Sequence, residues 1–207
     1  MTIYLYSGTV GSSKSLHAAN EIRFALNRPS QRPVIGNFEL SPTAPVRSRD
    51  NYTYLPNSEL TAQSLIDYAE EYWTSRDFFK EDYITLIIDE AQLLFNSRCW
   101  TQKDRMEFLE FFSQSRKYGY KVIFIAQSAK MIDNQFRMLV EYEINHRRVS
   151  SMGVIGWLLS LLFGGNKLFC WVEYLFQTNE RLGASWYLAK RKDFAMYDSF
   201  KKFEKKQ

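Results

Sequence analysis

Three short polar segments could do chemistry, and each follows an apolar run typical of a buried strand. The first has the spacing Gly-x-x-x-x-Gly-Lys-[Ser/Thr], which describes a phosphate-binding loop (P-loop) between a strand and a helix. Backbone N–H groups of such a turn converge on phosphate oxygens, and the following helix adds partial positive charge. We expect this loop to bind ATP with the residues Gly8, Thr9, Val10, Gly11, Ser12, Ser13, Lys14 and Ser15.

Within the loop, Lys14 would reach the β and γ phosphates, and the Ser15 hydroxyl would bind Mg²⁺, which prefers oxygen ligands. The pattern has glycine directly before the lysine, whereas this chain has Ser13. Glycine is usual there because the turn needs a conformation that is costly for other residues. We interpret the segment as a perturbed P-loop; the alternative is a Gly/Ser turn without a ligand.

The second and third segments end later strands. Asp89 and Glu90 follow Leu86-Ile87-Ile88, and Gln127 follows the strand expected from Lys121 to Ala126. Asp89 would bind Mg²⁺ through water or the Ser15 hydroxyl, and Glu90 would polarise the attacking water. Gln127 could sense the γ-phosphate. The alternatives are a helix cap facing solvent for the acidic pair and an ordinary strand-end amide for Gln127.

An arginine could complete the site from a neighbouring subunit, because its guanidinium is always charged and presents a fork of donors. Arg116 is the first candidate, ahead of Arg98 and Arg105, although such arginines also occur simply on solvated faces. His17 and His146 lie far apart in the chain, and neither is assigned a catalytic role. The two cysteines form no CxxC or Cys/His pattern typical of structural zinc.

The elements that position these segments alternate between strands and helices up to about residue 140. We expect helices over 16–27, from Ser58 to about Phe79, from Thr101 or Asp104 to Tyr118, and around 133–139. The apolar strands without alternation are typical of a parallel sheet covered on both faces. Ligands bind at the carboxyl ends of such strands, where all three segments fall. Runs at 142–149, 168–174 and 184–188 predict an antiparallel extension with a hairpin.

The length of 207 residues predicts one domain with a small appendage. We divide it into an ATPase core over 1–150, a β extension over 151–200 and a basic tail over 201–207. Residues 154–163 carry no charge and, as a helix of about 15 Å, would be too short to span a bilayer. This segment could lie in a membrane interface, or be buried in the core or against a partner. The N-terminus lacks the features of a signal peptide, so we expect the site to face the cytosol.

Four segments resemble the zonular occludens toxin-like family, which includes the assembly ATPases of filamentous phages. They are Tyr6–Ser15, Leu86–Gln92, Asp104–Tyr120 and Ile125–Asp133. The resemblance covers roughly residues 1–150 and implies an α/β fold of the additional-strand P-loop class, similar to RecA and FtsK. It implies that the Gln127 strand lies between the P-loop strand and the Asp89 strand. It also supports roles for Lys14, Ser15, Asp89, Glu90 and Gln127.

The resemblance implies that ATP hydrolysis drives assembly or extrusion of a DNA–protein filament at the cytoplasmic face of the host inner membrane. The expected partners are further copies in a ring, expected to be a hexamer, a membrane-embedded assembly protein, and phage DNA or coat protein. Many relatives continue into a membrane span, but the sequence here has no stretch of about twenty apolar residues. We therefore expect membrane contact through 154–163, the basic tail or a partner. The alternatives are a non-hydrolysing scaffold, suggested by Ser13, and a DNA-packaging or conjugation motor.

Overall fold

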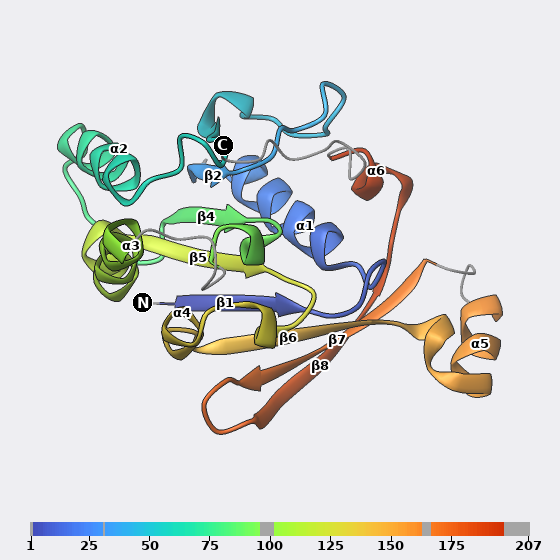
Figure 1. Ribbon diagram of the computed structural model, residues 1–207. Helices are drawn as coiled ribbons and strands as arrows, with labels where there is room; N and C mark the ends of the chain where they lie inside the picture. Colours follow the sequence, from blue (N-terminus) through green and yellow to red (C-terminus); the bar gives the residue numbers. More distant parts are fainter. Residues whose placement is uncertain (1, 31, 96–101, 163–166, 197–207) are drawn as a thin grey trace.

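A single mixed sheet of eight strands runs through the molecule in the order β3-β2-β4-β5-β1-β6-β7-β8 (Figure 1). The computed structural model describes residues 2–30, 32–95, 102–162 and 167–196. The strands are β1 (Thr2–Ser7), β2 (Val34–Gly36), β3 (Tyr52–Tyr54), β4 (Ile84–Ile88), β5 (Tyr120–Ile125), β6 (Tyr142–Arg148), β7 (Leu168–Leu175) and β8 (Glu180–Leu188).

The helices cover both faces of this sheet. They are α1 (Lys14–Asn27), α2 (Ala62–Thr74), α3 (Gln102–Gln114), α4 (Asn134–Met138), α5 (Gly153–Leu162) and α6 (Arg191–Phe194). Short 3₁₀ turns connect them at η1 (Arg49–Asn51), η2 (Ala91–Leu93), η3 (Ser115–Tyr118), η4 (Ala129–Met131) and η5 (Val149–Ser151).

The central strands are buried on both faces, which explains their continuous apolar sequences. Successive side chains of a strand point to opposite faces. Leu86 and Val122 therefore join the core under α2, α3 and α4, whereas Ile87 and Ile123 join the core under α1. The predicted two-side-covered parallel sheet is confirmed for β1 to β6, in which every neighbouring pair is parallel.

The strand order confirms that β5, which precedes Gln127, lies between β4 and β1. This arrangement brings the carboxyl ends of β4, β5 and β1 together at one edge of the sheet.

The predicted antiparallel extension is correct for β7 and β8 but wrong for β6. The strand β6 pairs with β1 in parallel and with β7 antiparallel. The reason is that the connection through α4 returns the chain to the start of the sheet, so β6 runs in the same direction as β5 and β1. The strands β7 and β8 continue this same sheet, while residues 197–207, which include the basic tail, lie outside the described residues.

The helix expected from Ser58 to Phe79 is shorter than predicted at both ends. Thr61 is its N-cap: the Thr61 hydroxyl oxygen accepts from the Ser64 N–H at 3.0 Å, and the Thr61 N–H donates to the Ser64 hydroxyl oxygen at 3.1 Å. This reciprocal pairing fixes the start three residues after Ser58. The helix ends at Thr74, and Phe79 then folds back so that its ring lies 4.9 Å from that of Trp73.

Gly119 is a structural requirement of the turn that leads into β5. Its φ is +76°, and a Cβ there would lie 2.7 Å from the Trp73 ring and 3.0 Å from the Lys80 carbonyl oxygen. We expect Gly119→Ala to lower the free energy of unfolding by about 1–3 kcal/mol, because it combines left-handed strain with a collision. Urea denaturation measures this. Gly183→Ala is the matched control, because nothing lies within 4 Å of the Cβ position in β8; equal losses in the two variants would contradict this account.

Candidate functional site

The predicted phosphate loop connects the end of β1 to the start of α1 and is wedged between two strands. The Gly8 N–H donates to the Gln127 carbonyl oxygen at 3.3 Å, which fixes the loop against the end of β5. On the other side, a Cβ at Gly8 would lie 2.4 Å from the His146 carbonyl oxygen in β6. Gly8 also has a φ of +140°, so this position requires glycine for both space and conformation.

Ser13 has the left-handed conformation that the usual glycine would adopt. Its φ is +83° and its ψ is +14°, directly before the first residue of α1. A non-glycine residue held in this region costs on the order of 1 kcal/mol. The expectation that serine stands at a conformationally costly point of the loop is therefore confirmed.

Two hydroxyls of the loop are buried without a hydrogen-bond partner, namely Ser12 Oγ and Ser13 Oγ. Buried polar atoms are normally hydrogen-bonded, so unpartnered ones in the described residues need an explanation. Both lie at the N-terminus of the 14-residue helix α1, where the helix dipole and free N–H groups favour an anion. The loop therefore fits a phosphate group, which could accept hydrogen bonds from these hydroxyls.

Lys14 folds back over the loop that precedes it. Its ammonium donates to the carbonyl oxygens of Gly8 at 2.8 Å and Thr9 at 3.1 Å. Burial lowers the pKa of Lys14 from its ordinary value, opposed by the nearby carboxylates of Glu90 and Asp89. The site thus holds its lysine close to the turn, in contact with backbone oxygens that a bound anion could replace.

Asp89 lies at the carboxyl end of β4 and faces the start of α1. The Ser15 hydroxyl is 3.5 Å from Asp89 Oδ2, across 74 residues of sequence. Burial raises the pKa of Asp89 to about 6, and the neighbouring Glu90 charge adds to this increase. A buried carboxylate beside a hydroxyl is the oxygen-rich environment that a hard divalent cation prefers. The structure therefore brings Ser15 and Asp89 together as the sequence predicted.

Glu90 and Gln127 complete the predicted group at this edge of the sheet. Glu90 has a φ of +50°, and its carboxylate accepts a hydrogen bond from the Gln92 amide. Gln127 has an exposed side chain directly after β5, while its backbone oxygen contacts Gly8. Glu90 and Gln127 therefore lie at the same end of the sheet as the phosphate loop.

Two asparagines that sequence reasoning missed fix the end of β4. The Asn37 side chain accepts from the Asp89 N–H at 2.8 Å and donates to the Asp89 carbonyl oxygen at 2.9 Å. It also donates to the Asn57 side chain at 2.9 Å. All three residues are buried, so this side-chain pairing continues the contact between β2 and β4 beyond the end of β2 and holds Asp89 in place. A polar residue directly after the Val34–Gly36 strand was the available signal.

The two histidines, separate in the sequence, form a pair behind the loop. His17 Nδ1 lies 2.9 Å from His146 Nε2, and His146 Nδ1 lies 3.2 Å from the Ser7 carbonyl oxygen. Burial lowers the pKa of His17 to about 4 and that of His146 to about 3. Both are therefore neutral at pH 7, and the pair links α1, β6 and the end of β1 as a structural support.

Arg148, at the end of β6, holds the tip of the loop. Its Nη2 and Nε donate to the Gly11 carbonyl oxygen at 2.9 and 3.2 Å. A Cβ at Gly11 would lie 2.5 Å from Arg148 Nη2, and Gly11 has a φ of +73°. No local pattern indicated this contact, which joins residues 137 positions apart.

The structure does not bring Arg116 to the loop of its own chain. Arg116 precedes β5, at the edge of the sheet opposite the strand ends, and its Nε lies 2.7 Å from a Glu81 carboxylate oxygen. Arg105 pairs with Asp133 at 2.9 Å, and Arg98 lies outside the described residues. A role for Arg116 across a subunit boundary stays a prediction.

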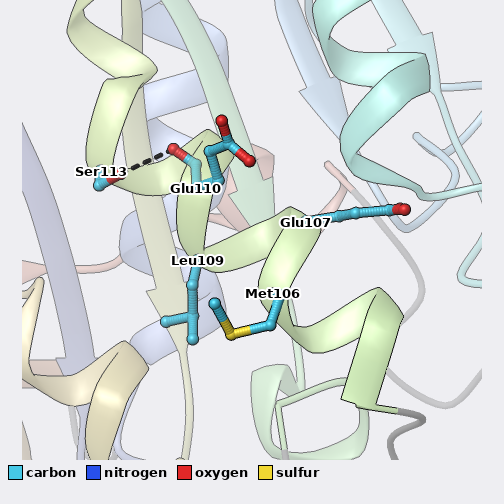
Figure 2. Close-up of a pocket in the computed structure, with 5 residues that line it drawn as sticks. All are labelled: Met106, Glu107, Leu109, Glu110 and Ser113. Atoms are coloured by element: carbon cyan, nitrogen blue, oxygen red, sulfur yellow. Dashed lines mark hydrogen bonds between the residues drawn. The ribbon is translucent and has the colours of Figure 1, made fainter.

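A hollow of about 480 Å³ lies on the exposed side of α3 (Figure 2). It is lined by Met106, Glu107, Leu109, Glu110 and Ser113, and Figure 2 shows the Ser113 hydroxyl bonded to the Glu110 carbonyl oxygen. Among the described residues its lining includes two carboxylates and no basic side chain, so it does not suit a phosphate ligand.

The fold and the loop define the class of this protein as a P-loop NTPase fold with an additional strand between β1 and β4. Residues 2–163 match the family described as zonular occludens toxin (Zot). The chain therefore belongs to the zonular occludens toxin family, as the sequence resemblance predicted.

Several curated phage proteins are similar to this chain. It is 29% identical over 179 residues to the Gene 1 protein of Enterobacteria phage I2-2, covering 80% of this chain and 46% of that protein. It is 28% identical over 179 residues to the Gene 1 protein of Enterobacteria phage M13, covering 79% and 48%. The chain thus spans about half the length of the curated relatives it matches.

Two solved structures share the fold. The N-terminal domain of zonular occludens toxin from Neisseria meningitidis has a TM-score of 0.59 at 17% identity, covering 95% of this chain and 98% of that one. B204, the DNA-packaging ATPase from Sulfolobus Turreted Icosahedral Virus, has a TM-score of 0.56 at 15% identity, covering 90% and 96%. At these identities the likeness establishes the fold.

The contact between Arg148 and Gly11 generates a prediction about the loop. We expect Arg148→Ala to increase amide hydrogen exchange at the loop tip about tenfold, because hydrogen bonds from a charged group contribute on the order of 1.5 kcal/mol. Arg147→Ala is the matched control, since Arg147 is exposed and its Nε donates to the Asn145 side chain instead. Identical exchange at the tip in both variants would contradict a holding role for Arg148.

The buried carboxyl of Asp89 generates a second prediction. Because its folded pKa of about 6 lies above the unfolded value, the folded state binds the extra proton, and stability falls as pH rises from about 4 to 6. Above this range the Asp89 carboxylate is charged, and its burial lowers the free energy of unfolding by the full amount. Asp89→Asn should therefore raise the free energy of unfolding at pH 8, by up to about 3 kcal/mol, and less at pH 4.

Urea denaturation of the ligand-free protein across this pH range measures the difference. Asp67→Asn, on the exposed face of α2, is the matched control for an Asp→Asn change. A destabilised Asp89→Asn protein at pH 8 would show that the charge is favourable in the fold, contrary to this account.

Proposed function

We propose that this chain is an Mg²⁺-dependent ATPase that drives assembly and extrusion of a filamentous phage at the cytoplasmic face of the host inner membrane. The observation that carries the proposal is the approach of the Ser15 hydroxyl to the Asp89 carboxylate, 3.5 Å apart beside the buried Lys14. Membership of the zonular occludens toxin family and similarity to phage Gene 1 proteins support the phage context.

Different residues of the chain bind the phosphates and the metal ion. The backbone of Gly8 to Ser13 and the N-terminus of α1 hold phosphate oxygens, and the unpartnered hydroxyls of Ser12 and Ser13 donate to them. Lys14 places its positive charge against the transferring group. The Ser15 hydroxyl and the Asp89 carboxylate hold Mg²⁺, which when bound supplies a divalent charge that neutralises the phosphates.

Glu90 activates the attacking water. It directly follows Asp89, and its carboxylate lies within hydrogen-bonding reach of the Gln92 amide. This bond holds the carboxylate in one orientation at the mouth of the site. Glu90 then accepts a proton from the attacking water, while the amide of Gln127, at the end of the adjacent strand, orients the γ-phosphate.

The proposed assembly is a ring, with a hexamer as the expected size, in which Arg116 of one copy serves the site of its neighbour. Arg116 is more than half exposed although it pairs with Glu81, so it could exchange partners at low cost. The proposed partners are a membrane-embedded assembly protein and the phage DNA or coat protein that is moved.

A second candidate function is a non-hydrolysing assembly scaffold. The left-handed conformation of Ser13 favours this candidate, because serine stores strain at the point where the loop approaches phosphate. The two functions differ in what glycine at this position would do.

We expect ATP turnover by the purified protein with Mg²⁺ to rise per subunit as protein concentration increases, because a shared site forms only in the assembled ring. Lys14→Ala should abolish turnover, and Glu90→Gln should lower it by about 10²–10⁴-fold while nucleotide binding remains. A phosphate-release assay measures the rate. Undiminished turnover in Glu90→Gln would exclude this carboxylate as the base.

Ser13→Gly separates the ATPase from the scaffold. Glycine relieves on the order of 1 kcal/mol of strain in the ligand-free and nucleotide-bound loops alike and removes one hydroxyl donor, so an ATPase with a mildly perturbed loop should keep its turnover within about fivefold while its free energy of unfolding rises. A scaffold would show turnover only after the substitution. Turnover of the wild type and of Ser13→Gly in the same phosphate-release assay distinguishes the outcomes.

A further inference from the structure

The helix α5 is packed with its small residues inward and its large apolar residues outward. Gly156 and Ser160 are its buried residues, and a Cβ at Gly156 would lie 2.3 Å from the Val149 carbonyl oxygen. Six large side chains on the other side are exposed, Ile155 by 76% and Trp157 by 55%: Val154, Ile155, Trp157, Leu158, Leu161 and Leu162. A core helix would show the opposite arrangement.

The same surface continues onto the last hairpin of the sheet. Leu168 and Cys170 pack with Val149 and Leu159 beneath α5. In the antiparallel pairing of β7 with β8, Leu188 lies opposite Leu168 and Trp186 opposite Cys170. Directly opposite residues share a face of the sheet, so Trp186 and Leu188, both exposed, lie on the face that carries α5.

We call this surface the apolar corner, and define it as the six exposed residues of α5 together with Met152, Trp186 and Leu188. In Figure 1, α5 protrudes on the side to which the arrowheads of β1, β4 and β5 point, which is the side of the phosphate loop. Exposed apolar surface gathered in this way marks an interaction site.

The two stretches of sequence that form the apolar corner carry charges of one sign. Residues 144–172 contain no aspartate or glutamate, and neither do residues 181–192. The exposed cations Arg147, Lys167 and Lys190 belong to these stretches, and the Ala189 N–H donates to the Lys167 carbonyl oxygen at 2.9 Å, which brings two of them to one place. An apolar surface with tryptophans and these exposed cations is complementary to an anionic bilayer surface.

A second copy of this chain and a membrane-spanning arrangement of α5 both fit these observations less well. A symmetric contact with a second copy would bring Arg147, Lys167 and Lys190 against the same residues of that copy, which like-charge repulsion opposes. A membrane crossing is excluded for α5 by its ten residues, and no helix in the described parts of the chain is long and apolar enough to span a bilayer.

We propose that the apolar corner docks on an anionic lipid bilayer, with α5 lying in the interface and Arg147, Lys167 and Lys190 contacting the headgroups. Only four positions separate Arg148, which holds the loop tip, from Met152 at the start of this surface. Docking would therefore place the phosphate loop close to the membrane. This proposal adds a membrane-contact surface to the proposed ATPase, and docking itself requires no ATP hydrolysis.

Vesicle flotation without nucleotide tests this. The probes are vesicles of phosphatidylglycerol with phosphatidylethanolamine, and vesicles of phosphatidylcholine alone. We expect the wild-type protein to partition at least tenfold more strongly onto the anionic vesicles, and Trp157→Ser/Leu161→Ser to lose at least tenfold of that binding. Met106→Ser/Met138→Ser removes two apolar side chains that are equally exposed elsewhere, and should bind as wild type does.

The charge contribution is tested by Lys167→Glu/Lys190→Glu, which should abolish the preference for anionic vesicles. Failure of the wild type to bind either vesicle, or equal loss in the methionine control, would overturn the proposal. So would self-association that the Trp157→Ser/Leu161→Ser protein loses in the absence of any vesicle binding, since the surface would then join two copies. Lys14→Ala should bind vesicles fully, which separates failure of docking from failure of the ATPase.

Discussion

The arrangement of this molecule depends on the tight turn at Gly8, where β1 leaves the sheet between β5 and β6. Its N–H bonds to the end of β5, and its Cα has no room for a side chain because the backbone of β6 lies against it. The loop is therefore supported from both sides before any ligand arrives. This turn sets the positions of Lys14, Ser15 and the start of α1. Asp89 lies close to them because β1, β5 and β4 are neighbouring parallel strands whose carboxyl ends lie together.

Support for the loop comes mainly from the later half of the chain. The His17–His146 pair, the contact of Arg148 with Gly11 and the Gln127 carbonyl all tie residues 7–17 to residues beyond 125. The same later half carries the apolar corner, which begins four residues after Arg148. A membrane bound at the apolar corner, as proposed, would therefore lie close to the phosphate loop.

The sequence was sufficient for features that depend on local pattern. Continuous apolar runs identified β1, β4 and β5, and the glycine and lysine spacing identified the loop, because these signals lie within a few residues of each other. It was insufficient where partners are remote. Asn37 pairs with Asp89 across 52 residues and Arg148 with Gly11 across 137, and only the register of distant strands determines these contacts. The direction of β6 was mistaken for the same reason, since it depends on where the α4 connection returns the chain.

Equilibrium binding of ATP, measured by calorimetry with and without Mg²⁺ under conditions that prevent turnover, tests most directly the claim that this strained loop is a nucleotide site. We predict saturable binding at one site per chain, weakened at least tenfold when Mg²⁺ is removed, because Ser15 and Asp89 would then lack the ion that they are proposed to bind. With Mg²⁺ present, the Lys14→Ala protein should bind ATP at least tenfold more weakly than the wild type does. Absence of binding at millimolar ATP, or an affinity unaffected by both Mg²⁺ and Lys14, would contradict it.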